Sequence, residues 1–453
     1  MSSGVDYAYA YPFESRLREV SGGRHLALAT CGGTEKNPYF FQGRLVHARR
    51  SADLLLTCSE ISRTRFYSPN EIRRFVFGAD PVVTSGGERL RFEAFSLCCG
   101  VYARVDLRPN AIEGEFFGRG TTNVDFNAPM RAALVSISNS EKVGLNVGEE
   151  VVELERGSEK VVERKVKLPV RWLKGFVEVQ AHQSNLKPAF EVSGEEARRF
   201  FSSLPKQKPR EKGSVSYVVP AGAGMRMTPR ETAQAVCVGA PGRLKVLEQL
   251  LRYATKLRVY GGDNGVSGWE LFLDDASFHL VLSPDASRGF SGEGQVLSQL
   301  AKERNSDELA KVRAALQWQA CIDVKVLSGR LGFDQKGVDD ALAALGARGL
   351  VGFDLADGAY FHRELPFNLE LVEQLQPRLI NARKLIEEKK VRITKQTQEN
   401  VEAYVKGTDV EHRVVITPQK AQCTCDWKSK HADERGECKH ILAVEILSDY
   451  ENN

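Results

Sequence analysis

The sequence predicts a multidomain α+β protein, and three observations support this fold class. At 453 residues, the chain is long enough to bury several hydrophobic cores. Its N-terminal half is rich in short β-like segments, whereas residues 305–400 show apolar side chains at helical spacing. Near the C-terminus, potential metal ligands gather in a charged stretch that is poor in apolar residues: Cys423, Cys425, Cys438 and His440.

Composition and charge limit the classes of protein to consider. A hydrophobic content of 42% and a charged content of 27% are typical of soluble globular proteins. A net charge of +4 over this length does not by itself indicate nucleic-acid binding. The N-terminus lacks the basic and apolar regions of a secretory signal, and no apolar run approaches the roughly 18 residues of a membrane span. We therefore expect a cytoplasmic protein with no membrane partner.

The remaining cysteines agree with this location. They are scattered and lie mostly in apolar contexts, as reduced core residues do, and not in a disulfide framework: Cys31, Cys58, Cys98, Cys99, Cys237 and Cys321.

Residues 1–204 are predicted to form a β-rich domain, such as a sandwich or a barrel-like fold. The predicted strands are enriched in β-branched and aromatic residues and are separated by Gly, Asn and Pro: 40–48, 54–58, 90–98, 101–107, 143–147, 161–168 and 176–180. Ser193 and Glu196 form a capping box, which predicts a short helix to about Ser203. The proline- and lysine-rich run 205–214 is then the predicted linker.

Residues 215–304 are predicted to be an α+β region, with a helix over 243–255 and strands over 257–260, 268–273 and 277–282. Residues 305–365 predict three helices and a β-hairpin that turns at Asp357-Gly358, an order similar to a winged helix.

The third helix of this winged-helix-like domain, residues 334–349, is the one that would enter a DNA groove. Its charges argue against that role, because Lys336 and Arg348 are outnumbered by acidic residues that would repel phosphates: Asp334, Asp339 and Asp340. Protein docking or packing is favoured, and DNA binding stays open.

Residues 366–400 are predicted to be a helical connector that Pro377 kinks or divides. The distal part of this connector is basic, and it forms either a nucleic-acid contact or a solvated helix face.

Residues 401–453 contain the spacing C-x-C-x12-C-x-H. Three thiolates and one imidazole complete the tetrahedral shell of a structural zinc ion and leave no position for a substrate. Alternate residues on a strand share a face, so a hairpin can present Cys423 and Cys425 together, while Cys438 and His440 open an amphipathic helix. Asp426 and His431 lie between the two pairs and are alternative ligands.

This pattern resembles the SWIM zinc finger, and the domain order resembles bacterial SWIM zinc finger family proteins. The resemblance implies one structural Zn²⁺ held by the four residues, and a module that binds DNA or protein. Some bacterial members accompany MoxR-type ATPases, which implies an adaptor role beside an ATPase acting in trans. The chain itself contains no G-x4-G-K-[ST] loop.

Two functions follow as expectations. The first is a non-enzymatic zinc-binding adaptor for a protein partner, nucleic acid or both, with no small-molecule substrate evident. The alternative is a metal-dependent nuclease whose site lies in the N-terminal domain, where acids such as Glu115 and Asp125 could converge.

Overall fold

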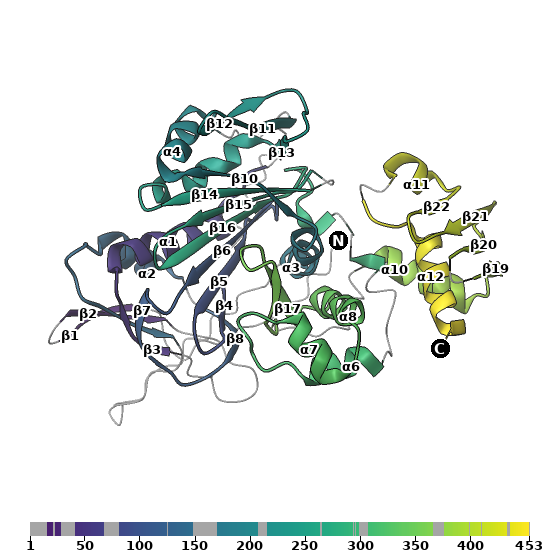
Figure 1. The fold of residues 1–453 in the computed structure, drawn as a ribbon, viewed down its shortest axis with the longest axis horizontal. Coiled ribbons are helices and arrows are strands. Elements are labelled where there is room, and N and C mark those ends of the chain that lie inside the picture. Colours follow the sequence, from purple (N-terminus) through teal and green to yellow (C-terminus); the bar gives the residue numbers. More distant parts are fainter. Residues whose placement is uncertain are drawn as a thin grey trace.

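The computed structural model describes residues 16–20, 23–28, 41–67, 81–147, 170–206, 215–298, 307–365 and 376–452, apart from residues 125, 263–264, 293, 295, 398, 409 and 433–434. Within these ranges the chain forms five β-sheets flanked by helices, which confirms the mixed α+β class (Figure 1). None of the helices in this part of the chain is long and apolar enough to cross a membrane.

An antiparallel sheet of eight strands is the largest element, in the order β10-β14-β15-β16-β6-β5-β4-β8. Its strands come from both sides of the predicted linker 205–214, so the chain does not separate into two domains at that linker. Residues 207–214 of the linker lie outside the described ranges. The strands are β4 (Val82–Ser85), β5 (Leu90–Phe95), β6 (Val101–Leu107), β8 (Gly120–Asn123), β10 (Lys187–Ser193), β14 (Lys256–Gly261), β15 (Ser267–Phe272) and β16 (Ala276–Leu282).

Two smaller sheets adjoin it. The order of the five-stranded sheet is β1-β2-β9-β3-β7, and that of the three-stranded sheet is β12-β11-β13. Their strands are β1 (Arg16–Val20), β2 (Gly23–Leu28), β3 (Phe41–Leu45), β7 (Ile112–Phe116), β9 (Val143–Val147), β11 (Val215–Ala221), β12 (Gly224–Thr228) and β13 (Val236–Gly239).

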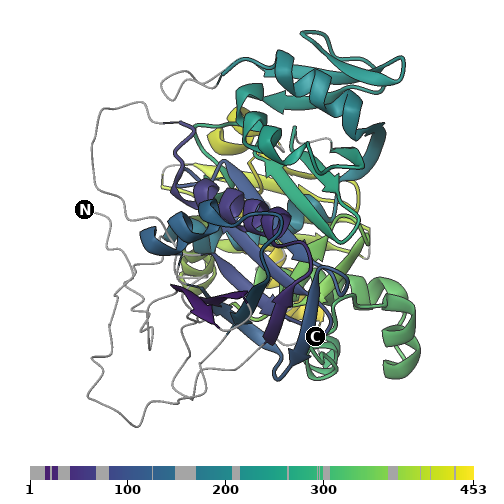
Figure 2. The ribbon, with the colours of Figure 1, turned by 90° about the vertical axis from the view of Figure 1, so that its left-hand side faces the viewer.

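Helices pack against these sheets. Helix α1 (Ala48–Arg63) packs against β5 and β6, and α2 (Ala128–Ser136) packs against α1 (Figure 2). Helix α4 (Gly194–Ser203) begins as predicted, because the Ser193 hydroxyl accepts a hydrogen bond from the backbone N–H of Glu196.

Three predicted elements in this part of the chain differ from the structure. Residues 54–58 lie inside α1, and residues 176–180 lie inside helix α3 (Val170–Gln183), although both were predicted to be strands. A short apolar run without clear alternation cannot distinguish a buried helix from a buried strand. The predicted helix over 243–255 is a shorter 3₁₀ helix, η1 (Pro241–Leu250). The strand predicted over 161–168 lies outside the described residues.

The eight-stranded sheet has one apolar face and one face, here called the charged face, on which charged residues lie among apolar ones, because successive side chains on a strand alternate. Phe92, Val105 and Phe278 represent the apolar face and belong to the main hydrophobic core. On the other face, one row of directly paired residues crosses six neighbouring strands, namely Glu93, Arg104, His279, Glu270, Arg258 and Glu191. We refer to this as the charged row.

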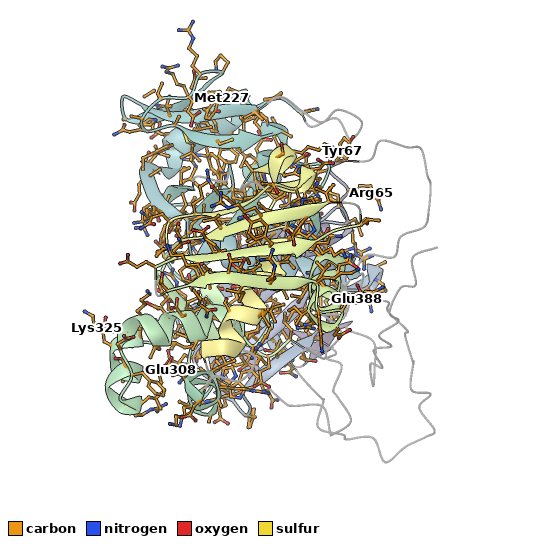
Figure 3. The ribbon with its side chains drawn as sticks, turned by 90° about the vertical axis from the view of Figure 1, so that its right-hand side faces the viewer. Arg65, Tyr67, Met227, Glu308, Lys325 and Glu388 are labelled. Atoms are coloured by element: carbon orange, nitrogen blue, oxygen red, sulfur yellow. The ribbon has the colours of Figure 1, made fainter. Side chains whose placement is uncertain are left out.

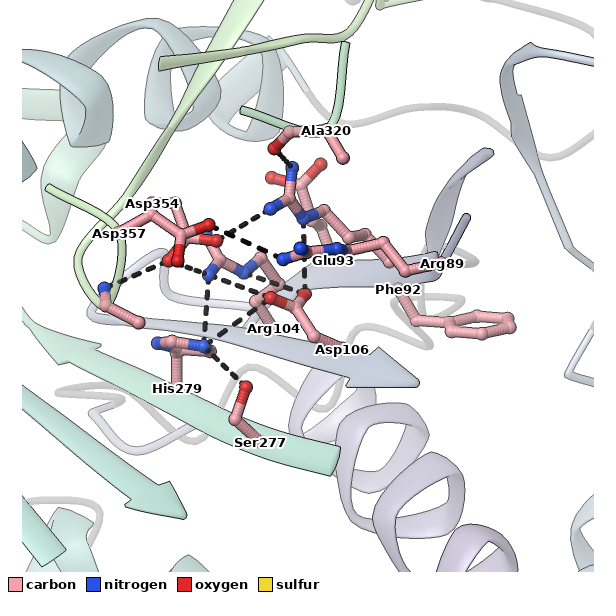
Figure 4. A network of polar contacts seen from close by, with 12 residues as sticks. Arg89, Phe92, Glu93, Arg104, Asp106, Ser277, His279, Ala320, Asp354 and Asp357 are labelled. Atoms are coloured by element: carbon pink, nitrogen blue, oxygen red, sulfur yellow. Dashed lines mark hydrogen bonds and ion pairs between the residues drawn. The ribbon is translucent and has the colours of Figure 1, made fainter. Parts of the chain in front are cut away.

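The predicted three helices and hairpin are present between residues 307 and 365. They are α6 (Asp307–Ala314), α7 (Val324–Leu331), α8 (Gln335–Ala347), β17 (Val351–Asp354) and β18 (Ala359–His362). The hairpin lies against the charged face of the sheet, where the Asp354 carboxylate is 2.7 Å from both Arg91 Nη2 and Arg104 Nη2 (Figure 4). Arg91 also lies 3.9 Å from the centre of the Phe361 ring. Buried ion pairs and a cation–π contact therefore hold the hairpin to the sheet.

Helix α8 is buried along its second half. Residues Ala344–Ala347 are buried, and α8 packs against α3, whereas the first half exposes Asp339 and Asp340. Helix α3 thereby connects the parts of the molecule, because its Val177 and Ala181 belong to a second hydrophobic core shared with the C-terminal helices.

Replacing Asp354 by asparagine is expected to lower the free energy of unfolding by about 3–5 kcal/mol, because Arg91 and Arg104 would each lose a buried partner. Chemical denaturation of the full chain measures this. Asp357→Asn is the matched control, since Asp357 is partly exposed and contacts Arg89 at 3.5 Å, and its effect should stay within about 1 kcal/mol. Equal effects of the two variants would contradict this account of docking.

Burial lowers the pKa of the His182 imidazole in α3 to about 4, below the usual value of about 6.5. Between these values the unfolded chain binds a proton that the folded chain does not, so the free energy of unfolding falls as the pH falls. The free energy of unfolding of the wild-type protein is therefore expected to fall between pH 7 and pH 4. In His182→Gln this fall should be smaller by roughly 3 kcal/mol. His47→Gln, which changes a half-exposed imidazole, should leave the fall intact, and the same pH dependence in all three proteins would contradict the prediction.

Candidate metal centre

The C-terminal module consists of a four-stranded antiparallel sheet, β19-β20-β21-β22, with helices packed on one face. Its strands are β19 (Val391–Gln396), β20 (Val401–Lys406), β21 (Glu411–Ile416) and β22 (Ala421–Cys423), and its helices are α10 (Pro377–Glu387), α11 (Asp426–His431) and α12 (Lys439–Asn452). Pro377 begins α10, where its missing N–H costs no hydrogen bond. Residues 366–375 of the predicted connector lie outside the described ranges.

Two short segments of this module supply the four predicted ligands. Cys423 ends β22, and Cys425 is the N-cap residue of α11. Cys438 follows a turn at Gly436, whose φ of +65° lies in the left-handed region that glycine adopts without strain. His440 then lies in the first turn of α12.

The ligating atoms of these four residues all lie within 4.8 Å of one another, so the residues could hold a metal ion. Cys423 Sγ is 3.7 Å from His440 Nδ1, and the sulfur–nitrogen edge of a tetrahedral zinc site measures about 3.6 Å. Cys425, Cys438 and His440 are each at most 4% exposed. The arrangement fits a closed shell with four protein ligands.

Hydrogen bonds among the thiols shift their pKa values in opposite directions. The hydrogen bond with Cys425 raises the pKa of Cys423 to about 11, whereas the pKa of Cys425 is lowered by its bond with Cys423. The pKa of Cys438 is raised, mainly by its hydrogen bond with Cys423. A bound cation would favour the thiolate form of all three cysteines.

The two alternative ligands lie outside this group. Asp426 is exposed at the start of α11, and His431 ends that helix with its ring 4.5 Å from that of Trp427. Among the described residues, the group of potential ligands at this site contains neither of them.

Arg378 of α10 holds the loop that precedes Cys438. Its Nη1 donates hydrogen bonds to the carbonyl oxygens of Arg435, at 2.6 Å, and Glu437, at 2.9 Å. Lys428 of α11 also donates to the Glu437 carboxylate at 2.9 Å. Because Glu437 is bonded covalently to Cys438, these contacts restrict the position of the Cys438 sulfur.

The inner face of the sheet and α12 provide the apolar support of the site. Ala403, Val405 and Val414 on the strands are completely buried, as are residues 441–444 of α12. His440, in the first turn of α12, and the adjacent Cys438 are therefore positioned by the same packing that folds the module.

A second group of potential ligands, which we did not predict, consists of Asp106, His279 and Asp354. All three are buried, but Arg104 Nη2 already lies among them, at 3.0 Å from Asp106 Oδ2, 3.0 Å from His279 Nε2 and 2.7 Å from Asp354 Oδ1 (Figure 4). A guanidinium occupies the place that a cation would take. The signal in the sequence was the alternation of charged residues within the predicted strands, such as Arg104 and Asp106.

The acids considered for a nuclease are not assembled into a site in the described structure. Glu115 is exposed on β7, at one edge of the five-stranded sheet, and Asp125 lies outside the described residues. Neither group of potential ligands found in the described part of the chain includes Glu115.

Comparisons with known proteins do not identify the chain. No protein-family model and no curated protein matches it. Among solved structures, it is similar to the crystal structure of Proliferating Cellular Nuclear Antigen from Entamoeba histolytica, with a TM-score of 0.33 and 10% sequence identity, over 54% of this chain and 99% of that chain. A likeness this weak supports no assignment of function.

Replacing Arg378 by methionine is expected to weaken metal binding roughly 10- to 100-fold, because the loop before Cys438 would lose two hydrogen bonds. Competition with a chromophoric zinc chelator measures the affinity. Lys384→Met changes an exposed cation on the same helix and should leave the affinity unchanged. Equal affinities in the two variants would show that Arg378 does not position the ligands.

Proposed function

We propose that this protein is a non-enzymatic, zinc-binding adaptor whose C-terminal module is a SWIM-type zinc finger. One observation supports the proposal most directly: the side chains of Cys423, Cys425, Cys438 and His440 meet in one group with the composition of a closed zinc shell, and all but the half-buried Cys423 are buried. Structural zinc sites use three thiolates and one imidazole in this way, whereas catalytic sites keep one position open.

Zinc is favoured over other metals by the chemistry of the ligands. Soft thiolates select zinc, copper(I) or iron–sulfur clusters, and a mixed thiolate–imidazole set at tetrahedral spacing favours zinc among them. Magnesium and calcium require oxygen ligands, and the group contains none.

The adaptor role is supported by the packing of the winged-helix-like segment against the rest of the molecule. In the winged-helix-like segment, the hairpin is held to the eight-stranded sheet through Asp354, and the second half of α8 is packed against α3. A segment fixed in this way suits packing better than insertion into a DNA groove. We therefore assign partner binding to the C-terminal module, in a cytoplasmic protein that binds a protein, for example an ATPase acting in trans, or nucleic acid.

A nuclease remains the second hypothesis from the sequence, and within the described residues Glu115 joins no group of potential metal ligands that would favour it. Incubating the protein with magnesium and DNA separates the two functions. Cleavage that is lost in Glu115→Gln would overturn the adaptor proposal.

Purified protein is expected to contain one zinc ion per chain, and Cys438→Ser is expected to lose it. Because metal binding contributes on the order of 10 kcal/mol to the folding of small zinc modules, residues from about 400 onward should become sensitive to protease in the variant. Cys321→Ser, which changes an exposed cysteine outside the site, should keep its zinc. Full zinc content together with an unchanged cleavage pattern in Cys438→Ser would refute the assignment.

A further inference from the structure

The C-terminal sheet has a second face on which none of the described helices packs. Helix α12 packs on the inner face, where Ala403, Val405 and Val414 are buried, and α10 packs against α12. On the opposite face the alternate residues of the same strands are exposed or half-buried, and Figure 3 looks toward these strands. We call this the outer face, and its residues are Arg392, Lys395, Glu402, Tyr404, Lys406, Glu411, Arg413, Val415 and Gln422.

The centre of the outer face is an aromatic ring between two arginines. Tyr404 lies on β20, which has a neighbouring strand on each side. It is directly paired with Arg392 on β19 and with Arg413 on β21. The Arg392 guanidinium lies 5.1 Å from the centre of the Tyr404 ring. A half-buried ring flanked by guanidinium groups can stack on one base while the arginines contact the adjacent phosphates.

Basic residues outnumber acidic ones on this face. Four cations, Arg392, Lys395, Lys406 and Arg413, stand against two carboxylates, Glu402 and Glu411. Both carboxylates form exposed ion pairs, Glu402 with Arg413 at 2.9 Å and Glu411 with Arg392 at 3.6 Å. Exposed pairs of this kind contribute little stability, so a phosphate can replace a carboxylate as the partner of an arginine.

The outer face lacks the apolar centre that a protein partner would bury. Apart from Tyr404, its one apolar side chain is Val415, which is half-buried, and the remaining residues are charged or amide side chains such as Gln422. Protein interfaces concentrate apolar residues and exclude charges at their centre, whereas nucleic-acid interfaces are polar and basic.

We propose that the outer face binds single-stranded nucleic acid, with one base stacked on Tyr404 and the backbone held by Arg392, Arg413 and the lysines. This rests on the proposed function, because the metal-stabilised module presents the sheet. A four-stranded sheet with an aromatic residue on an inner strand is a known platform for single strands, since unpaired bases can lie flat on it. A duplex hides its base faces, and its major groove admits only a helix or a two-stranded ribbon.

The test uses the full chain, with its zinc content measured on the same sample. Fluorescence anisotropy would follow binding of a 5′-labelled dT20, a U20 of the same length and a 20-base-pair duplex across a salt series. We expect dT20 or U20 to bind more tightly than the duplex, with an affinity that falls as salt rises. Tyr404→Ala should weaken binding roughly 5- to 150-fold, whereas Tyr404→Phe should retain most of the affinity.

Charge variants give an independent readout. Arg392→Ala should weaken binding and make the salt slope shallower by about 0.7, and Glu411→Gln, which removes a carboxylate from the same face, should strengthen binding. Arg199→Ala is the matched control, because Arg199 is an exposed arginine paired with two glutamates on the distant helix α4, and it should bind as the wild type does.

Three outcomes would overturn the inference: no binding of either single strand at low salt, tighter binding of the duplex, or binding that Tyr404→Ala leaves unchanged. If the protein in these experiments carries one zinc per chain, the adaptor proposal survives and its partner is a protein. A protein without zinc would instead refute the proposed function itself.

Discussion

The arrangement of this molecule depends on the pairing of arginine and carboxylate groups inside it. Arg91 and Arg104 project from adjacent strands of the eight-stranded sheet, and both contact Asp106 within the sheet and Asp354 from the hairpin. An unpaired charge at such depth would be strongly unfavourable. The hairpin therefore cannot shift along the sheet without breaking several buried ion pairs, and the helices that precede it are fixed with it.

The pKa values in this network follow the same constraint. Burial by itself would raise the pKa values of Asp106 and Asp354, but Arg104 and Arg91 lower both below the usual value. Both carboxylates therefore stay ionised, as the pairing requires. Asp354 belongs to the hairpin and Asp106 to the sheet. The network of two arginines and two carboxylates is therefore completed only when the hairpin packs on the sheet.

The C-terminal module uses a different means of stability. Among the described residues, one face of its sheet packs against helices, so its own apolar core is small. A metal ion bound by Cys423, Cys425, Cys438 and His440 would join β22, α11 and α12 at one point and compensate for the limited core. The ion would lie beside the inner face and would leave the outer face uncovered by the metal site.

The sequence was most informative where structure is local. The spacing of Cys423, Cys425, Cys438 and His440 was sufficient to group them, since two short segments hold all four. Strands with clear alternation, such as β6, and helices with a cap, such as α4, were also predicted close to their observed bounds. These features depend on residues within a few positions of each other.

Features that depend on distant residues were not predictable in this way. Arg91 and Asp354 are 263 residues apart, so the sequence around each of them does not indicate that they form an ion pair. Helix α1 is buried on nearly all sides, which removes the periodicity that distinguishes a helix from a strand and led to the wrong prediction for residues 54–58. The outer face of the C-terminal sheet emerged only once the register placed Tyr404 beside Arg392 and Arg413.

The charged row has a consequence for how the chain is made. All eight strands of the large sheet precede β17 in the sequence, so they leave the ribosome before the hairpin that will cover them. A newly formed apolar face would invite aggregation during that interval, whereas a face of paired charges, such as Glu93 with Arg104 and Glu270 with Arg258, is compatible with water. The paired charges therefore reduce the apolar surface that this face exposes before the hairpin is made, and Asp354 later supplies the carboxylate that pairs with Arg91 and Arg104.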